Sequence, residues 1–119
     1  MEEALKREVQ NLKVLVAEAG KLADTPSAPE TYYQMAQKIL SRRAYLSGLL
    51  VDAEQAYEND KLYLKNEKDL SVAAAENEAK TMPNYSLFKK AKGADELAAE
   101  QVLLLKRMLV SRDSEFQQS

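Results

Sequence analysis

Apolar residues recur at alternating intervals of four and three over a long stretch that contains no proline, between Pro29 and Pro83. Such spacing lines them up along one side of an α-helix. In order, that side holds Tyr32, Ala36, Ile39, Arg43, Leu46, Leu50, Ala53, Tyr57, Asp60 and Leu64. We predict a helix over residues 28–66, about 57 Å long at 1.5 Å per residue. A compact monomer of this size could not cover such a helix, so an elongated hairpin or an oligomer is expected.

A second heptad seam lies near the N-terminus, within a helix predicted over residues 1–23. Its members are Leu5, Val9, Leu12, Val16, Ala19 and Ala23. Alternating Leu and β-branched residues favour two parallel strands in a coiled coil, and about three heptads are the lower limit for one. Leu15 and Leu22 widen the apolar side. Packing against more than one helix is therefore the other interpretation.

The clearest break in the pattern follows the first helix. Pro26 and Pro29 cannot lie inside a helix, but Pro29 suits the first turn of the next one. Ser27 and Glu30 have the spacing of a capping box. The long helix is therefore expected to begin near Ala28.

Two more helices are predicted after the long one. A cap signal at Ser71 precedes a short Ala-rich helix over residues 72–80, and the last helix is expected over residues 85–114. The apolar side of the last helix holds Leu87, Ala91, Ala94, Ala98, Val102, Leu105, Met108 and Leu109.

These patterns predict an all-α protein, an elongated helical hairpin or bundle with a long central helix. All-β folds need frequent turns, and the chain has only three glycines and three prolines. We expect one domain over residues 1–119, in which residues 28–115 form the hairpin. We also expect a homo-oligomer, held together by Leu5, Val9, Leu12, Val16, Leu46, Leu50 and Leu105.

Composition argues against catalysis. The chain has no histidine and no cysteine, and therefore lacks the commonest general base, the thiolate nucleophile and the main transition-metal ligands. Glu54 and Glu58 lie four residues apart, which we interpret as a solvated acidic face. We expect no enzyme activity, no cofactor and no metal site.

Charge is unevenly distributed along a chain of net charge −2. Residues 52–80 carry eight acidic and four basic side chains, whereas residues 81–112 carry three acidic and six basic ones. The basic last helix could bind an anionic partner, or the two segments could pair with each other. The longest apolar run, Val102 to Leu105, is too short to cross a membrane, and the N-terminus is charged. We expect a cytoplasmic protein without a membrane partner.

Basic and aromatic residues lie close together at two places, as they do in proteins that bind single-stranded nucleic acid. The candidate residues for such binding are Lys61, Tyr63, Lys65, Lys89, Lys90 and Arg112. The alternative is structural, with tyrosines in a core or interface and lysines that only make a helix soluble.

The long helix contains Asp52-Ala53-Glu54-Gln55-Ala56-Tyr57-Glu58-Asn59-Asp60-Lys61-Leu62-Tyr63-Leu64, and the last one contains Leu103-Leu104-Leu105-Lys106-Arg107-Met108-Leu109-Val110-Ser111-Arg112. With this helix order, the chain resembles small helical recombination-accessory proteins of tailed bacteriophages, the UvsY-like recombination mediators, over residues 32–115. The resemblance implies a helical oligomer in the cytoplasm of the host cell. It also implies binding to single-stranded DNA and to a recombinase or a single-strand-binding protein. The basic segment of that family corresponds here to residues 59–65, which hold only Lys61 and Lys65 as basic residues.

Three functions are therefore compared. The first is a non-enzymatic recombination accessory protein that binds single-stranded DNA. The second is a phage protein-interaction adaptor or inhibitor that does not bind nucleic acid, with the acidic residues 52–78 facing a basic partner or the helix seams capturing a partner helix. The third is a helical component of a virion.

Overall fold

The computed structural model describes residues 2–22 and 27–118, with side chains described up to residue 111. It contains α1 (Glu2–Lys21), α2 (Pro29–Glu67), α3 (Val72–Ala79) and α4 (Pro83–Gln118). No strand occurs within these residues. The molecule is elongated, with extents of 70 × 25 × 19 Å. The predicted all-α class with a long central helix is confirmed.

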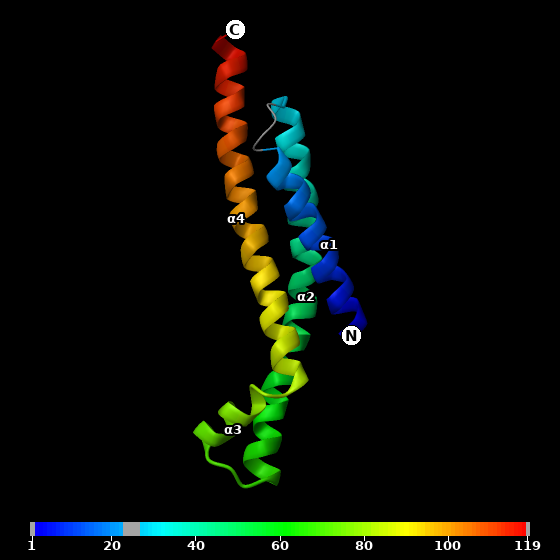
Figure 1. Ribbon diagram of the computed structural model, residues 1–119, viewed down its shortest axis with the longest axis vertical. Coiled ribbons are helices and arrows are strands. Elements are labelled where there is room, and N and C mark those ends of the chain that lie inside the picture. Colours follow the sequence, from blue (N-terminus) through cyan, green and yellow to red (C-terminus); the bar gives the residue numbers. More distant parts are fainter. Residues whose placement is uncertain (1, 23–26, 119) are drawn as a thin grey trace.

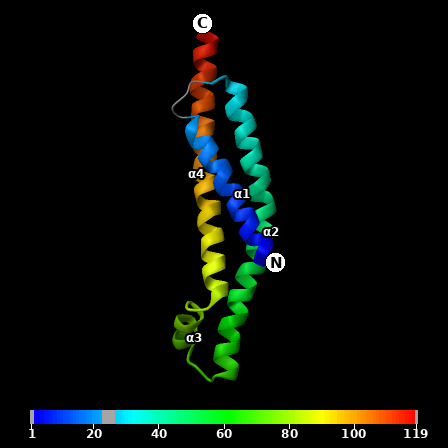
Figure 2. The same ribbon diagram turned by 45° about the vertical axis from the view of Figure 1, so that its right-hand side comes forward.

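α2 and α4 run antiparallel and form the hairpin on which the other two helices lie (Figure 1). α1 packs against both of them, whereas α3 packs against α2 at the opposite end of the hairpin (Figures 1 and 2). α4 extends past the end of α1 and the start of α2 in both views. The result is a three-helix bundle at one end and a hairpin closed by a short helix at the other.

The predicted apolar side of α2 is the side that the structure buries. Seven of its ten members are buried, namely Tyr32, Ala36, Ile39, Leu46, Ala53, Tyr57 and Leu64. Leu50 is partly buried against the same core. The heptad spacing suits neighbouring helices that cross at a small angle, which is how long antiparallel helices stay in contact along their length.

α1 and α4 contribute matching sides. On α1 the seam members Leu5, Val9, Leu12 and Ala19 are buried and Val16 is partly buried, while the predicted member Ala23 lies outside the described residues. On α4 the buried members are Ala91, Ala94, Ala98, Val102 and Leu105. The three alanines have small side chains, and these let the neighbouring helices approach α4 closely.

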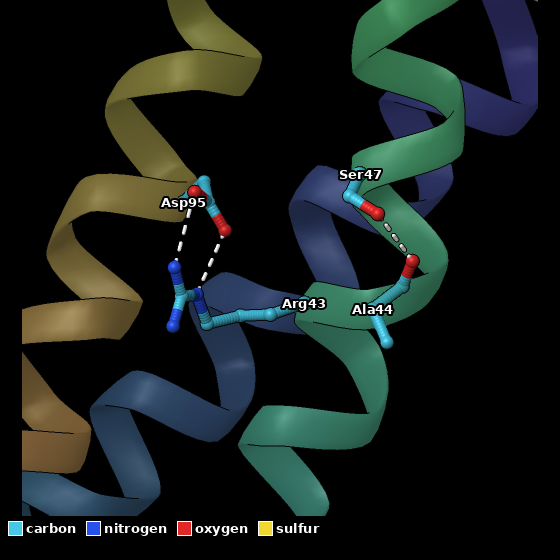
Figure 3. Close-up of polar contacts among 4 residues, drawn as sticks. All are labelled: Arg43, Ala44, Ser47 and Asp95. Carbon is cyan, nitrogen blue, oxygen red and sulfur yellow. Dashed lines mark hydrogen bonds and ion pairs between the residues drawn. The ribbon is translucent and has the colours of Figure 1, made fainter.

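The two polar positions in the α2 seam are matched by polar side chains of α4. The Arg43 guanidinium donates hydrogen bonds to both carboxylate oxygens of Asp95, at 2.8 and 3.4 Å (Figure 3). The hydrogen bond and the charge of Asp95 raise the pKa of Arg43, although its partial burial opposes this. Lower along the hairpin, the Asn84 amide donates to Asp60 at 3.0 Å. Two such pairs fix the register of α2 against α4, because a shift of one turn would separate both.

The helix ends confirm one local prediction and correct two others. Ser71 is the N-cap of α3, where its hydroxyl accepts from the N–H of Ala74 at 3.2 Å, as predicted. The capping box at Ser27 is wrong, since the N-cap of α2 is Ala28 and makes no side-chain cap hydrogen bond. The N–H of Ser27 instead donates to the Tyr32 hydroxyl at 3.2 Å. The helix α4 begins at Pro83, before its predicted start. Proline is tolerated there because N–H groups in the first turn of a helix have no partner within the helix, so the absence of one costs no hydrogen bond.

The buried hydrophobic residues form two clusters. We call the first the three-helix region, where α1, α2 and α4 bury aliphatic side chains such as Leu12, Leu46 and Leu105. The second, the α3 region, contains Tyr57, Leu64, Ala75, Ala79, Leu70, Met82 and Tyr85. Phe88 contacts both clusters.

Candidate interaction surfaces

Three aromatic rings of the α3 region pack together, and each carries a lysine. The ring centroid of Tyr57 lies 5.0 Å from that of Tyr85 and 6.3 Å from that of Phe88. The amino groups of Lys61, Lys89 and Lys92 lie over the rings of Tyr57, Tyr85 and Phe88, at 4.7, 5.6 and 6.0 Å from the centroids. These distances are those of cation–π contacts. We call these six residues the lysine–aromatic cluster.

Each lysine and its ring are four residues apart on one helix, so the pairing follows from helical geometry. The meeting of the three pairs does not, because it depends on the register of α2 against α4. The sequence predicted Lys61 and Lys89 as members of one site, and the structure brings the rings beside them, Tyr57 and Tyr85, into contact. It did not predict Lys92, Tyr85 or Phe88; their spacing, aromatic followed by lysine four residues on, was the available signal.

Lys61 is already engaged within the chain. Its amino group lies 2.8 Å from a carboxylate oxygen of Glu58. This hydrogen bond is the main reason that the pKa of Lys61 is raised above its usual 10.5; burial opposes the rise, and the charges of Glu58, Tyr57 and Glu76 add to it. Glu58 therefore offsets the charge that Lys61 could offer to an external anion.

Of the other two predicted residues of α2, Lys65 lines a hollow next to α3 and Tyr63 does not. Lys65 and Lys61 both line a hollow of about 190 Å³ between α2 and α3, together with Glu58 and Glu76. Tyr63 is half exposed, but it lies two positions from each lysine, which is about 200° around the helix. Its ring therefore does not point with Lys61 and Lys65.

The remaining predicted residues lie elsewhere. Lys90 faces α1 across a groove described below. Arg112 belongs to the last part of α4, and its side chain lies outside the described residues. That end of α4 is at the opposite end of the molecule from α3 (Figure 1). The structure thus places Lys61 and Lys65 at one hollow and Lys61 and Lys89 beside rings that touch, and the described side chains do not put the predicted nucleic-acid residues on one surface.

The residues predicted to hold an oligomer together are the core of a single chain. The side chains of Leu5, Leu12, Leu46 and Leu105 are at most 1% exposed, Val9 is buried, and Val16 and Leu50 are partly buried. Helices of the same chain therefore account for the heptad pattern without a second subunit. Oligomerisation stays a prediction, and a surface other than these buried side chains would have to carry it.

A groove runs between α1 and α4 in the three-helix region. It consists of two adjoining hollows of about 230 and 160 Å³ that share Lys13. Its lining residues are Leu5, Lys6, Val9, Gln10, Lys13, Val16 and Ala17 of α1, with Leu87, Lys90, Ala94 and Leu97 of α4. We call this the α1–α4 groove. Its floor is apolar, and Leu97 on its wall is 58% exposed; Leu62 and Leu103, on other surfaces, are exposed to a similar degree.

The charged residues of the α1–α4 groove are all basic. Lys6, Lys13 and Lys90 line it, and no aspartate or glutamate does. Lys6 makes an exposed ion pair with Glu2 at 3.0 Å. Within the described part of the chain, Lys13 and Lys90 make no ion pair.

Within the described part of the chain, no group of three or more acidic side chains is placed to hold a metal ion. None of the described helices combines the length and the apolar character needed to cross a membrane.

Comparison of the chain with family models, with curated proteins and with solved structures gave no match. The resemblance to phage recombination mediators therefore stays a prediction.

Proposed function

We propose that this protein is a non-enzymatic interaction protein whose α1–α4 groove receives a helix of a partner protein. The supporting observation is the groove itself, which has an apolar floor, an exposed Leu97 and lysines on both walls. Amphipathic helices bind such grooves by laying their apolar side into them. This function is that of the protein-interaction adaptor predicted from the sequence. The difference is that the partner helix would bind in a groove between two helices and not along a heptad seam.

The length of the groove suits one short helix. On α1 its lining residues extend from Leu5 to Ala17, a rise of about 18 Å and roughly three turns. A helix placed there would lie alongside α1 and α4 and complete a four-helix arrangement with α2, a common way for helices to pack.

Binding rather than catalysis is proposed because of the chemistry of the groove. Its polar side chains are three lysines and Gln10, and they include no paired acid and base. A reaction site would need a nucleophile or general base oriented by a second group.

A selection from a displayed library of amphipathic helices tests the proposal. Helices that bind the native chain should lose about tenfold or more in affinity for Leu97→Asp, because the substitution places a charge in the apolar contact. Leu103→Asp is the matched control, since Leu103 is 54% exposed on the same helix and does not line the groove. The proposal fails if no helix is enriched, or if both variants lose binding equally.

A second candidate is a single-stranded DNA contact at the lysine–aromatic cluster, in keeping with the recombination-accessory role that the resemblance implies. The contact between the rings of Tyr57, Tyr85 and Phe88, each with a lysine beside it, favours it. The contacts would be to phosphates, because the rings pack against one another and Lys61 lies over the Tyr57 ring, which leaves less ring surface on which a base could stack.

Fluorescence anisotropy with a labelled single-stranded oligonucleotide, across a salt series, tests this candidate. Affinity should fall with salt with a slope of about −0.7 for each phosphate neutralised. Lys89→Gln with Lys92→Gln should make that slope shallower, by about one unit or more. An absence of binding at low salt would remove the candidate.

A further inference from the structure

We infer that the helix received by the α1–α4 groove is acidic along both of its flanks, an inference that rests on the proposed function. The groove presents an apolar floor between two basic walls. A complementary helix therefore has an apolar side bordered on each edge by aspartate or glutamate.

The positions of the lysines suit contacts with carboxylates on both flanks of such a helix. Lys6 and Lys13 are seven residues apart on α1, so they lie on the same side of that helix about 10 Å apart along its axis. Lys90 stands on the opposite wall, from α4. Carboxylates at heptad spacing on one flank would face Lys6 and Lys13, and a carboxylate on the other flank would face Lys90, as flanking charges do in coiled coils.

The rest of the chain shows that these lysines are unusual. In the hollow between α2 and α3, Lys61 and Lys65 share the walls with Glu58 and Glu76, so opposite charges are balanced within the chain. In the α1–α4 groove the three lysines meet no lining carboxylate, although the chain as a whole is acidic, with net charge −2. Lys6 is paired with Glu2 of its own helix, so it is to Lys13 and Lys90 that an anionic partner would supply an opposite charge.

The apolar floor distinguishes an acidic helix from a nucleic acid. Leu5, Val9 and Leu87 border one hollow, and Val16, Ala94 and Leu97 border the next. A phosphate backbone gains nothing from covering these side chains, whereas the apolar side of a helix is stabilised by their burial. The groove therefore suits a protein helix whose flanks, rather than its contact side, carry the charge.

The test uses a displayed helix library in which the apolar positions are fixed and the flanking positions are random. The native chain should enrich Asp and Glu at the flanks. The double variant Lys13→Glu with Lys90→Glu should lose that enrichment and favour Lys and Arg. Single acidic helices from the first selection should bind the double variant about tenfold more weakly, at roughly threefold for each exposed charge pair lost.

The control carries the same change of charge away from the groove, at Lys38→Glu with Lys106→Glu. Both lysines are exposed and neither lines the groove. It should select the same acidic helices as the native chain. Circular dichroism confirms that each variant keeps its helix content.

The outcomes separate this inference from the proposed function. Helices selected without preference for charge, and sensitive to Leu97→Asp, would overturn the acidic partner and leave the groove as a helix site. Equal loss of acidic helices in the control would show that only net charge matters, which also overturns the inference. Failure to select any helix would overturn both proposals. Stoichiometric displacement of a bound acidic helix by a single-stranded oligonucleotide would assign the groove to phosphates instead.

Discussion

The three-helix region and the α3 region are built from the same long helices but held together in different ways. In the first, three helices meet along their length and bury aliphatic side chains, from leucine to alanine, together with Tyr32. In the second, the two long helices are joined by a helix of only eight residues, and aromatic rings with lysines beside them pack with aliphatic side chains such as Leu64 and Leu70. One end therefore depends on aliphatic packing between helices, and the other on ring contacts, a cap and a tight chain reversal.

The reversal shows how local the second solution is. After α2 ends at Glu67, Asp69 adopts a left-handed backbone conformation with φ of 54°, which aspartate tolerates better than most residues. The N–H of Leu70 then donates to the carbonyl of Leu64 at 3.3 Å, and the side chain of Leu70 packs into the α3 region. We therefore expect the three-helix region to set global stability and the α3 region to open by itself.

The largest effect is expected for Leu46→Ala. Leu46 is fully buried among three helices, so its truncation should lower the free energy of unfolding by about 3–5 kcal/mol. Leu64→Ala in the α3 region should lower it by about 2 kcal/mol, because a short helix can settle into the space left. Urea denaturation of both variants measures the difference. Equal losses would contradict the view that the α3 region is the softer end.

Much of the helix packing could be predicted from the sequence. The heptad spacing identified the buried sides of α1, α2 and α4 because a side chain's position around a helix depends only on its own chain. The same spacing cannot tell whether the neighbouring helix belongs to the same chain. The side chains assigned to an oligomer, Leu12 and Leu46 among them, were for this reason found in the core of one chain.

The interaction surfaces were less predictable, because each needs residues from two helices in a defined register. Lys61 and Lys89 could be chosen singly, but the contact between the rings beside them, Tyr57 and Tyr85, depends on how α2 packs on α4. The α1–α4 groove was not predicted at all. Its lysines lie among ordinary helix-surface residues in the sequence, and only the packing of α1 shows that Lys13 and Lys90 face one groove.

The next largest effect concerns the one buried charge that the structure records, Glu8 of α1. It is 4% exposed and accepts a hydrogen bond from Arg42 at 3.2 Å. Arg42→Ala should lower the free energy of unfolding by about 2 kcal/mol, because it leaves a buried carboxylate without this donor. Adding Glu8→Gln should recover part of the loss.

A matched exposed pair gives the control for this prediction. Lys6 and Glu2 are both about 60% exposed, and Lys6→Ala should change stability by less than about 0.5 kcal/mol. If both substitutions cost the same, burial of Glu8 has no energetic consequence, and the attachment of α1 rests on its apolar seam alone.

A smaller and local effect is expected for Ser71→Ala. It removes the cap hydrogen bond to the N–H of Ala74 and should destabilise α3 by about 1 kcal/mol. Amide hydrogen exchange within α3 should therefore speed up about fivefold, while that of residues around Leu46 stays unchanged. Ser86→Ala, at an exposed serine, serves as the control. Faster exchange throughout the chain would show that the two regions unfold together.

The smallest effect is expected at alkaline pH and concerns the contribution of Lys61 to the stability of the α3 region. The pKa of Lys61 is raised above 10.5 chiefly by its hydrogen bond to Glu58, so the contribution of this pair is fully present below that pH. It should be lost as the pH rises through the higher folded-state pKa. Lys61→Gln should therefore be slightly less stable than the native chain near about pH 8 and equal to it once the pH exceeds the folded-state pKa of Lys61. Urea midpoints at several pH values measure this convergence. A gap that persists at high pH would mean that Lys61 stabilises the α3 region by packing its hydrocarbon chain on Tyr57, not by its charge.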